Sequence, residues 1–143
     1  MGKINVGRVI LGGIVAGIVG DILGYFVDGL LLAPSWTSAM KALGQPALSM
    51  NQILWFNVLG IVVGLASIWV YAAIRPRFGP GVKTAIYAGV AVWVVGTLVP
   101  NVSFMCVAGL FSQYHSLTFY TTLGGIVEIV VGTIAGAALY KEG

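Results

Sequence analysis

The 143-residue chain has very little charge. Its seven Lys and Arg residues and four Asp and Glu residues make up 8% of the sequence, whereas 59% is hydrophobic. A soluble domain usually carries about 25% charged residues, so this scarcity excludes an ordinary soluble globule and indicates an integral membrane protein. The chain also has a single cysteine, Cys106, and a single histidine, His115. This shortage excludes an internal disulfide, and it gives no reason to expect a metal or cofactor site.

Long apolar runs account for most of the sequence. Four of them can each cross a bilayer core of about 30 Å, which takes about 20 helical residues. Proline, glycine or a polar cluster separates each run from the next. The sequence therefore predicts one all-α domain over residues 1–143, an integral membrane bundle of four transmembrane helices with spans at 6–32, 50–74, 84–111 and 117–140.

The segment between the first two runs has a helical pattern of its own. Pro34 stands near its start and Gly44 just beyond its end, as is typical of helix boundaries. Trp36, Met40 and Leu43 fall on one face, so we expect a short helix lying in the outer interface of the membrane. The pattern leaves open whether this helix only connects two spans or also caps a site.

Basic residues gather on one side of the predicted bundle. Six of them lie before or at the start of the first run, between the second and the third, or after the fourth: Lys3, Arg8, Arg75, Arg77, Lys83 and Lys141. Only Lys41 falls on the other side. Because short cytoplasmic segments carry an excess of cations, both termini are predicted to face the cytoplasm. The cations form no single basic face with aromatic residues, so the expected environment is the lipid bilayer and no nucleic-acid partner is expected.

Two acidic residues stand near the middle of apolar runs. Asp21 lies in the first run and Glu128 in the fourth. A charge at the centre of a membrane helix costs about 2.5 to 3.5 kcal/mol. No basic residue lies at a matching depth, so these acids must be protonated, hydrogen-bonded to neutral partners or in contact with water. Glycine and alanine recur every four residues beside both acids, which predicts that they face neighbouring helices.

Other polar residues of the runs fall near the same depth. Asn57 lies in the second run, and Asn101 and Ser103 lie in the third, where Pro100 is expected to interrupt the helix. The predicted intramembrane polar site therefore has five members: Asp21, Asn57, Asn101, Ser103 and Glu128. Asp28, Trp36 and His115 are candidates for its outer side. Two interpretations stay open, a hydrogen-bonded network that fixes the register of the bundle and a site that exchanges protons.

The candidate functions follow from these two interpretations. A static network favours a structural or accessory subunit of a larger membrane assembly or of a homo-oligomer, and the sequence alone ranks this class first. Proton exchange favours a carrier that couples small-molecule transport to Asp21 and Glu128. A membrane enzyme that acts on a lipophilic substrate through the same two carboxylates is the least favoured class, because the lone histidine falls in an outer loop.

Two resemblances bear on these classes. With four spans and a membrane-embedded glutamate, the chain resembles the small multidrug transporters. It is longer than they are and has an acid in both the first and the fourth span, so no residue role carries over. In addition, Arg8–Gly13, Ser38–Gly44 and Tyr71–Gly81 followed by Lys83–Ala85 are similar to segments of a bacterial family of four-span proteins with a domain of unknown function. That resemblance covers nearly the whole chain and implies a bacterial inner membrane, a four-helix fold and no particular activity.

Overall fold

The computed structural model describes residues 3–106 and 115–143, and every regular element among them is a helix. The first span consists of α1 (Val6–Gly24) and the π-helix η1 (Tyr25–Leu31), and the short helix α2 (Ala33–Ala42) follows it. The second span is α3 (Met50–Phe78). The third consists of α4 (Val82–Trp93), the π-helix η2 (Val94–Leu98) and α5 (Val99–Cys106), and the fourth is α6 (His115–Ala137).

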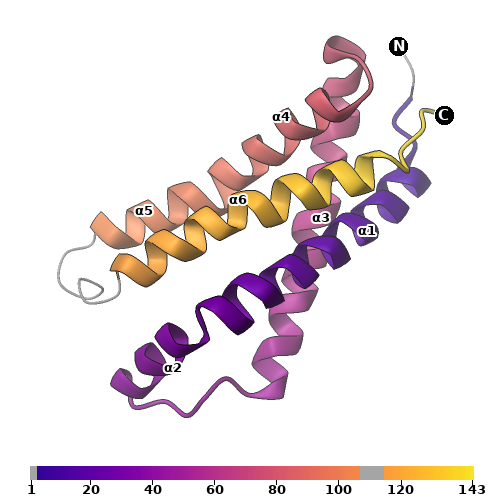
Figure 1. Cartoon of the computed structure of the whole chain (residues 1–143). Coiled ribbons are helices and arrows are strands. Elements are labelled where there is room, and N and C mark those ends of the chain that lie inside the picture. The colour runs from indigo at the N-terminus through magenta and orange to yellow at the C-terminus, as the bar shows by residue number, and fades with distance from the viewer. Residues whose placement is uncertain (1–2, 107–114) are drawn as a thin grey trace.

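Four helical spans are long and apolar enough to cross a membrane: Val6–Leu31, Met50–Phe78, Val82–Cys106 and His115–Ala137. The predicted all-α bundle of four such helices with a short additional helix is therefore confirmed. Both termini lie at one end of the bundle, together with the turn between α3 and α4, and α2 lies at the other end (Figure 1). We call these the terminal end and the α2 end.

Several span boundaries differ from the prediction. The second span was predicted to end at residue 74, but α3 continues through Pro76 to Phe78. A proline in the last turn removes only one backbone hydrogen bond, and the helix ends instead where Gly79 adopts a φ of 81°. The third span begins at Val82, two residues early, after Gly81. The fourth ends at Ala137 and not at residue 140, because the next residues form tight turns. The predicted end at residue 111 lies outside the described residues.

Rows of small residues bring α1 close to two neighbours. On one row, a Cβ atom at Gly13 would lie 2.6 Å from the Cα atom of Leu65 in α3. On the adjacent row, a Cβ atom at Gly132 of α6 would lie 2.5 Å from the backbone oxygen of Ala16. Backbones this close leave room for a hydrogen atom and not for a side chain. The close helix packing predicted from the four-residue spacing is thus confirmed.

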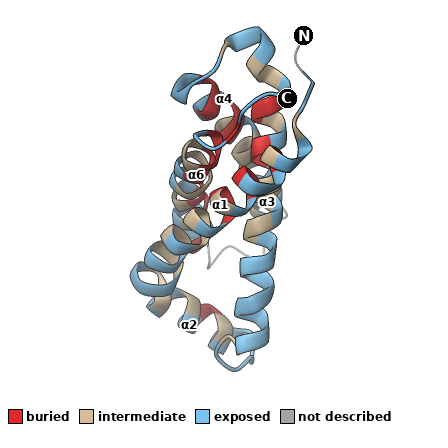
Figure 2. Ribbon diagram, turned by 90° about the vertical axis from the view of Figure 1, so that its right-hand side faces the viewer, coloured by how far each residue is buried: buried red, intermediate tan, exposed pale blue. Residues whose placement is uncertain are grey.

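The buried core lies toward the terminal end (Figure 2). Its members are Val9, Ala16, Ile68, Tyr71, Ala72, Ala85, Ala88, Ala137 and Tyr140. The Tyr140 hydroxyl accepts the backbone N–H of Asn5 at 3.3 Å, and the Tyr71 hydroxyl accepts that of Gly81 at 3.2 Å. The two rings meet edge to face with centroids 5.8 Å apart. At the α2 end, by contrast, every residue of the segment 50–59 of α3 is exposed, so the helices are packed at one end and spread apart at the other.

Candidate functional site

The α2 end contains a cavity of about 740 Å³. Its walls come from α1, η1, α2, the following loop, the part of α3 from Ile53 to Ser67, η2, α5 and α6. Small-molecule sites usually measure about 300 to 1,000 Å³. Three of the four acidic residues of the chain line the cavity, namely Asp21, Asp28 and Glu128, whereas no Lys, Arg or His is found among its described lining residues. The cavity is therefore apolar over most of its wall and strongly biased toward negative charge.

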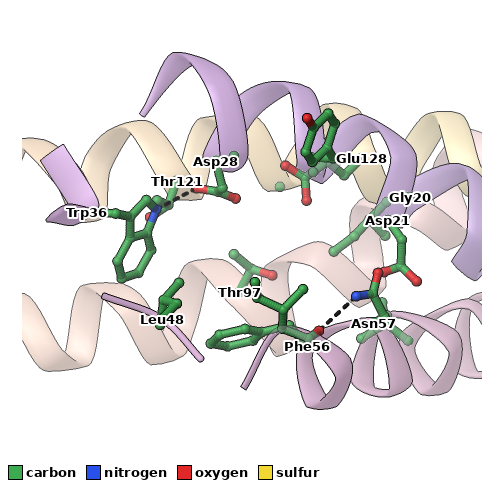
Figure 3. Close-up of a pocket in the computed structure, with 18 of the residues that line it drawn as sticks. Gly20, Asp21, Asp28, Trp36, Leu48, Phe56, Asn57, Thr97, Thr121 and Glu128 are labelled. Carbon is green, nitrogen blue, oxygen red and sulfur yellow. Dashed lines mark hydrogen bonds between the residues drawn. The ribbon is translucent and has the colours of Figure 1, made fainter. Parts of the chain in front are cut away.

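Asp21 comes from the row of α1 that faces α3. Its carboxylate lies directly against Gly60 of α3, where a Cβ atom would overlap Oδ1. Asn57, one turn earlier on α3, lies beside Asp21 in Figure 3. Its side-chain N–H nevertheless donates to the backbone oxygen of Ile53 at 2.7 Å. The absence of a side chain at Gly60 is thus what allows the Asp21 carboxylate to fit between the two helices.

Glu128 comes from α6 and lies between glycines of two helices. A Cβ atom at Gly24 of α1 would lie 3.4 Å from Oε2, and one at Gly124 would lie 3.3 Å from Oε1. The Oε1 atom is buried and accepts no hydrogen bond from the described residues. Burying a polar atom without a partner is unfavourable. Oε1 is therefore the atom of the site at which a proton or a ligand N–H group gives the greatest stabilisation.

Asp28 lies in η1, where the helix is wider than an α-helix. A π-turn joins the backbone N–H of Leu32 to the oxygen of Val27 at 2.8 Å, and such turns are frequent at functional sites. The indole N–H of Trp36 in α2 donates to Oδ1 of Asp28 at 3.1 Å (Figure 3). Trp36 and Met40 also line the cavity. The position of α2 thus supports the second of its two predicted roles, a cap over a site.

Six of the eight predicted site residues reach the cavity, and Ser103 and His115 do not. Ser103 is exposed and donates to the backbone oxygen of Val99 in its own helix at 2.8 Å, and His115 is exposed at the start of α6. Asn101 lines the cavity and donates to the hydroxyl of Thr122 in α6 at 2.7 Å. Within the described residues, therefore, the predicted five-membered hydrogen-bonded network does not form, and four of its members surround a cavity instead.

Most lining residues were not predicted, among them Tyr25, Phe56 and Thr97. Tyr25 and Phe56 have the residue types expected at a lipid-facing position, so nothing in their pattern separates them from other exposed aromatics. Thr97 carried a usable signal, because it lies four residues before Asn101 and such residues share a helix face.

Neither metals nor relatives assign a function to the site. No group of three residues able to hold a metal ion occurs in the part of the chain that the structure describes. No protein-family model, curated protein or solved structure matches this chain. The function must therefore be argued from the cavity and its residues.

Proposed function

We propose that the protein is a membrane carrier that binds a small molecule in the cavity and couples its movement to protons at Asp21 and Glu128. The observation that supports this most is that carboxylates from two different spans share one cavity and have no basic partner among its described lining residues. A protonated carboxyl group can release its proton when a ligand arrives and take it up again when the ligand leaves. The sequence alone favoured an accessory subunit, and the cavity reverses that order.

The packing of the two ends supports a carrier as well. Carriers open a central site to one side of the membrane at a time. Here the cavity lies at the α2 end, whereas the terminal end is closed by the buried core. The guanidinium of Arg75 lies 3.3 Å from a carboxylate oxygen of Glu142 and 5.4 Å from the centre of the Tyr140 ring. In this proposal, these contacts separate when the site opens toward the terminal end.

We place the terminal end in the cytoplasm and the protein in a bacterial inner membrane, on the basis of the cation distribution and the family resemblance. The test is a Pro80→Cys substitution in a Cys106→Ala background, since Pro80 lies in the exposed turn between α3 and α4. An impermeant maleimide should label inverted vesicles and leave intact spheroplasts unlabelled. Labelling of intact spheroplasts would show that the orientation is reversed.

Infrared difference spectroscopy tests proton exchange without any knowledge of the substrate. For the wild type in lipid bilayers, we expect the protonated carboxyl band to change between about pH 5 and 9. Asp21→Asn and Glu128→Gln keep side-chain volume and cannot release a proton, so each should remove part of the change. Glu142→Gln is the matched control, because Glu142 lies at the terminal end beside Arg75. A band that stays constant across the window contradicts the carrier.

An accessory subunit is the second candidate, and the exposed first part of α3 favours it. Trp55 is 67% exposed and Phe56 57% exposed, and a partner helix on this side would cover both the aromatics and the cavity. Purification from a native membrane extract separates the two candidates. A second polypeptide, or a second copy of this chain, held in fixed stoichiometry supports the subunit. A single chain that carries only lipid supports the carrier.

A further inference from the structure

The wall of the cavity has carboxylate oxygens that accept no hydrogen bond from the residues the structure describes. Within residues 3–106 and 115–143, Asp28 is the one acid of the three that accepts a side-chain hydrogen bond, from Trp36. Among the described residues, neither Asp21 nor Glu128 accepts one with its side chain. An ionised carboxylate can accept about four hydrogen bonds. The two acids therefore leave most of their acceptor capacity open to a bound molecule.

Donors in the same wall are mostly engaged with the protein. The side-chain amides of Asn57 and Asn101 donate to Ile53 and Thr122. Four hydroxyl groups of the wall donate to backbone oxygens of their own helices, namely those of Thr37, Ser67, Thr121 and Thr133. Because a hydroxyl has only one hydrogen, these four cannot also donate to a ligand. The open donors among the described lining residues are the hydroxyls of Tyr25 and Thr97 and the second N–H of each amide. The carboxylates offer more open acceptors than this, so a ligand that complements the wall brings mainly N–H or O–H donors.

The charge and the apolar surface of the cavity further restrict the class of ligand that fits it. No basic residue among the described lining residues offsets the carboxylates, so electrostatic complementarity calls for a cation. Figure 3 shows Trp36 and Leu48 toward one end of the cavity and Asp21 toward the other, with Phe56 between them. An elongated ligand can thus place a charged group near the acids and an apolar group against the aromatic and aliphatic side chains.

We propose that the cavity binds a protonated primary amine with an apolar body, whose ammonium N–H groups bond to the free oxygens of Asp21 and Glu128. This inference rests on the proposed carrier function and names its substrate class. The charge balance is simple: one ammonium ion enters as one proton leaves a carboxyl group, so the net charge of the cavity stays the same. A quaternary ammonium ion carries the charge but has no N–H group, and it satisfies none of the open acceptors.

Equilibrium dialysis of the wild-type protein in detergent micelles tests the proposal with four probes that share a phenylethyl body. Labelled 2-phenylethylammonium is the reporter ligand, and its trimethylammonium analogue, 2-phenylethanol and 3-phenylpropionate are added in turn as unlabelled competitors. Micelles without protein measure how much of the label partitions into detergent. The primary ammonium should bind at least about tenfold more tightly than each of the other three, because hydrogen bonds to a charged group are worth that factor or more. In weakly buffered micelles, about one proton should be released per amine bound.

Equal binding of the trimethyl analogue, equal binding of the alcohol, or no binding above empty micelles would overturn the proposal. This comparison needs only the wild type, so it stands even if a variant fails to fold. For folded variants, Asp21→Asn and Glu128→Gln should each weaken amine binding at least about tenfold. Ser103→Ala, at an exposed position outside the cavity, should leave it unchanged. If the infrared band titrates and no amine binds, the amine proposal fails and the carrier stands. If the amine binds selectively and the band is constant, the carrier fails.

Discussion

Alanine at Gly132 should weaken the bundle, whereas alanine at Gly20 should not. Both glycines lie in the contact between α1 and α6. A Cβ atom at Gly132 would lie 2.5 Å from the backbone oxygen of Ala16, while one at Gly20 would lie 3.6 Å from the backbone oxygen of Glu128, which is an ordinary contact distance. The oxygen of Ala16 belongs to a helix backbone and cannot rotate away. In the Gly132→Ala variant the two helices must therefore move apart.

The size of the effect follows from two opposing contributions. Alanine favours a helix over glycine by about 0.8 to 1 kcal/mol, and this gain is common to both variants. Overpacking costs about 1 to 3 kcal/mol and applies only at Gly132. We therefore expect the free energies of unfolding of the two variants to differ by about 1 to 3 kcal/mol, with Gly20→Ala at or above the wild type and Gly132→Ala below Gly20→Ala.

Titration with sodium dodecyl sulfate in mixed micelles, followed by far-ultraviolet circular dichroism, measures this difference as a shift in the unfolding midpoint. Both variants carry the same chemical change on the same interface, so each serves as the control for the other. Equal midpoints, or a higher midpoint for Gly132→Ala, would mean that α1 and α6 are farther apart than the structure shows and that the row of small residues does not set their distance.

Two further predictions concern single hydrogen bonds. Tyr140→Phe keeps the ring and removes the acceptor for the backbone N–H of Asn5, so the same titration should show a loss of about 0.5 to 1.5 kcal/mol; an unchanged midpoint would show that this bond does not hold the terminal end. Trp36→Phe removes the indole N–H that donates to Asp28, so amide hydrogens of α2 should exchange several-fold faster while the unfolding midpoint stays near that of the wild type. Unchanged exchange would show that the bond does not hold α2 over the cavity.

Local signals in the sequence predicted most of the fold. Serine favours the N-cap position of a helix, and Ser49 caps α3: its side chain accepts the N–H of Gln52, whose side chain accepts the N–H of Ser49 in return. The two rows on α1 are offset around the helix, so two rows of small residues predict two close neighbours. The predicted end of the second span was wrong because the effect of a proline depends on its position in the helix. Pro76 stands in the last turn of α3, where it removes one backbone hydrogen bond and the helix ends two residues later.

The site was less predictable, because depth and direction are separate quantities. Counting residues along the spans placed Asn101 and Ser103 at one level, but residues two apart do not share a helix face. Only Asn101 points toward α6, and Ser103 bonds to its own helix. The π-helices η1 and η2 add to the difficulty, since each widened turn rotates the following residues away from the α-helical pattern. No residue type in either segment predicts such a turn.

The cavity and its charge have a common origin in the rows of small residues. On α1, Gly13 and Gly17 precede Asp21 along the row that faces α3, and on α6, Glu128 takes the position one turn before Gly132. Where the row has a glycine, the backbones touch. Where it has an acid, a carboxylate must fit between the helices, and they diverge from that depth toward the α2 end. Glycines on the opposite helix accommodate these carboxylates, Gly60 for Asp21 and Gly24 for Glu128. The acidic residues in these rows therefore account both for the negative charge of the cavity and for the wider spacing of the helices there.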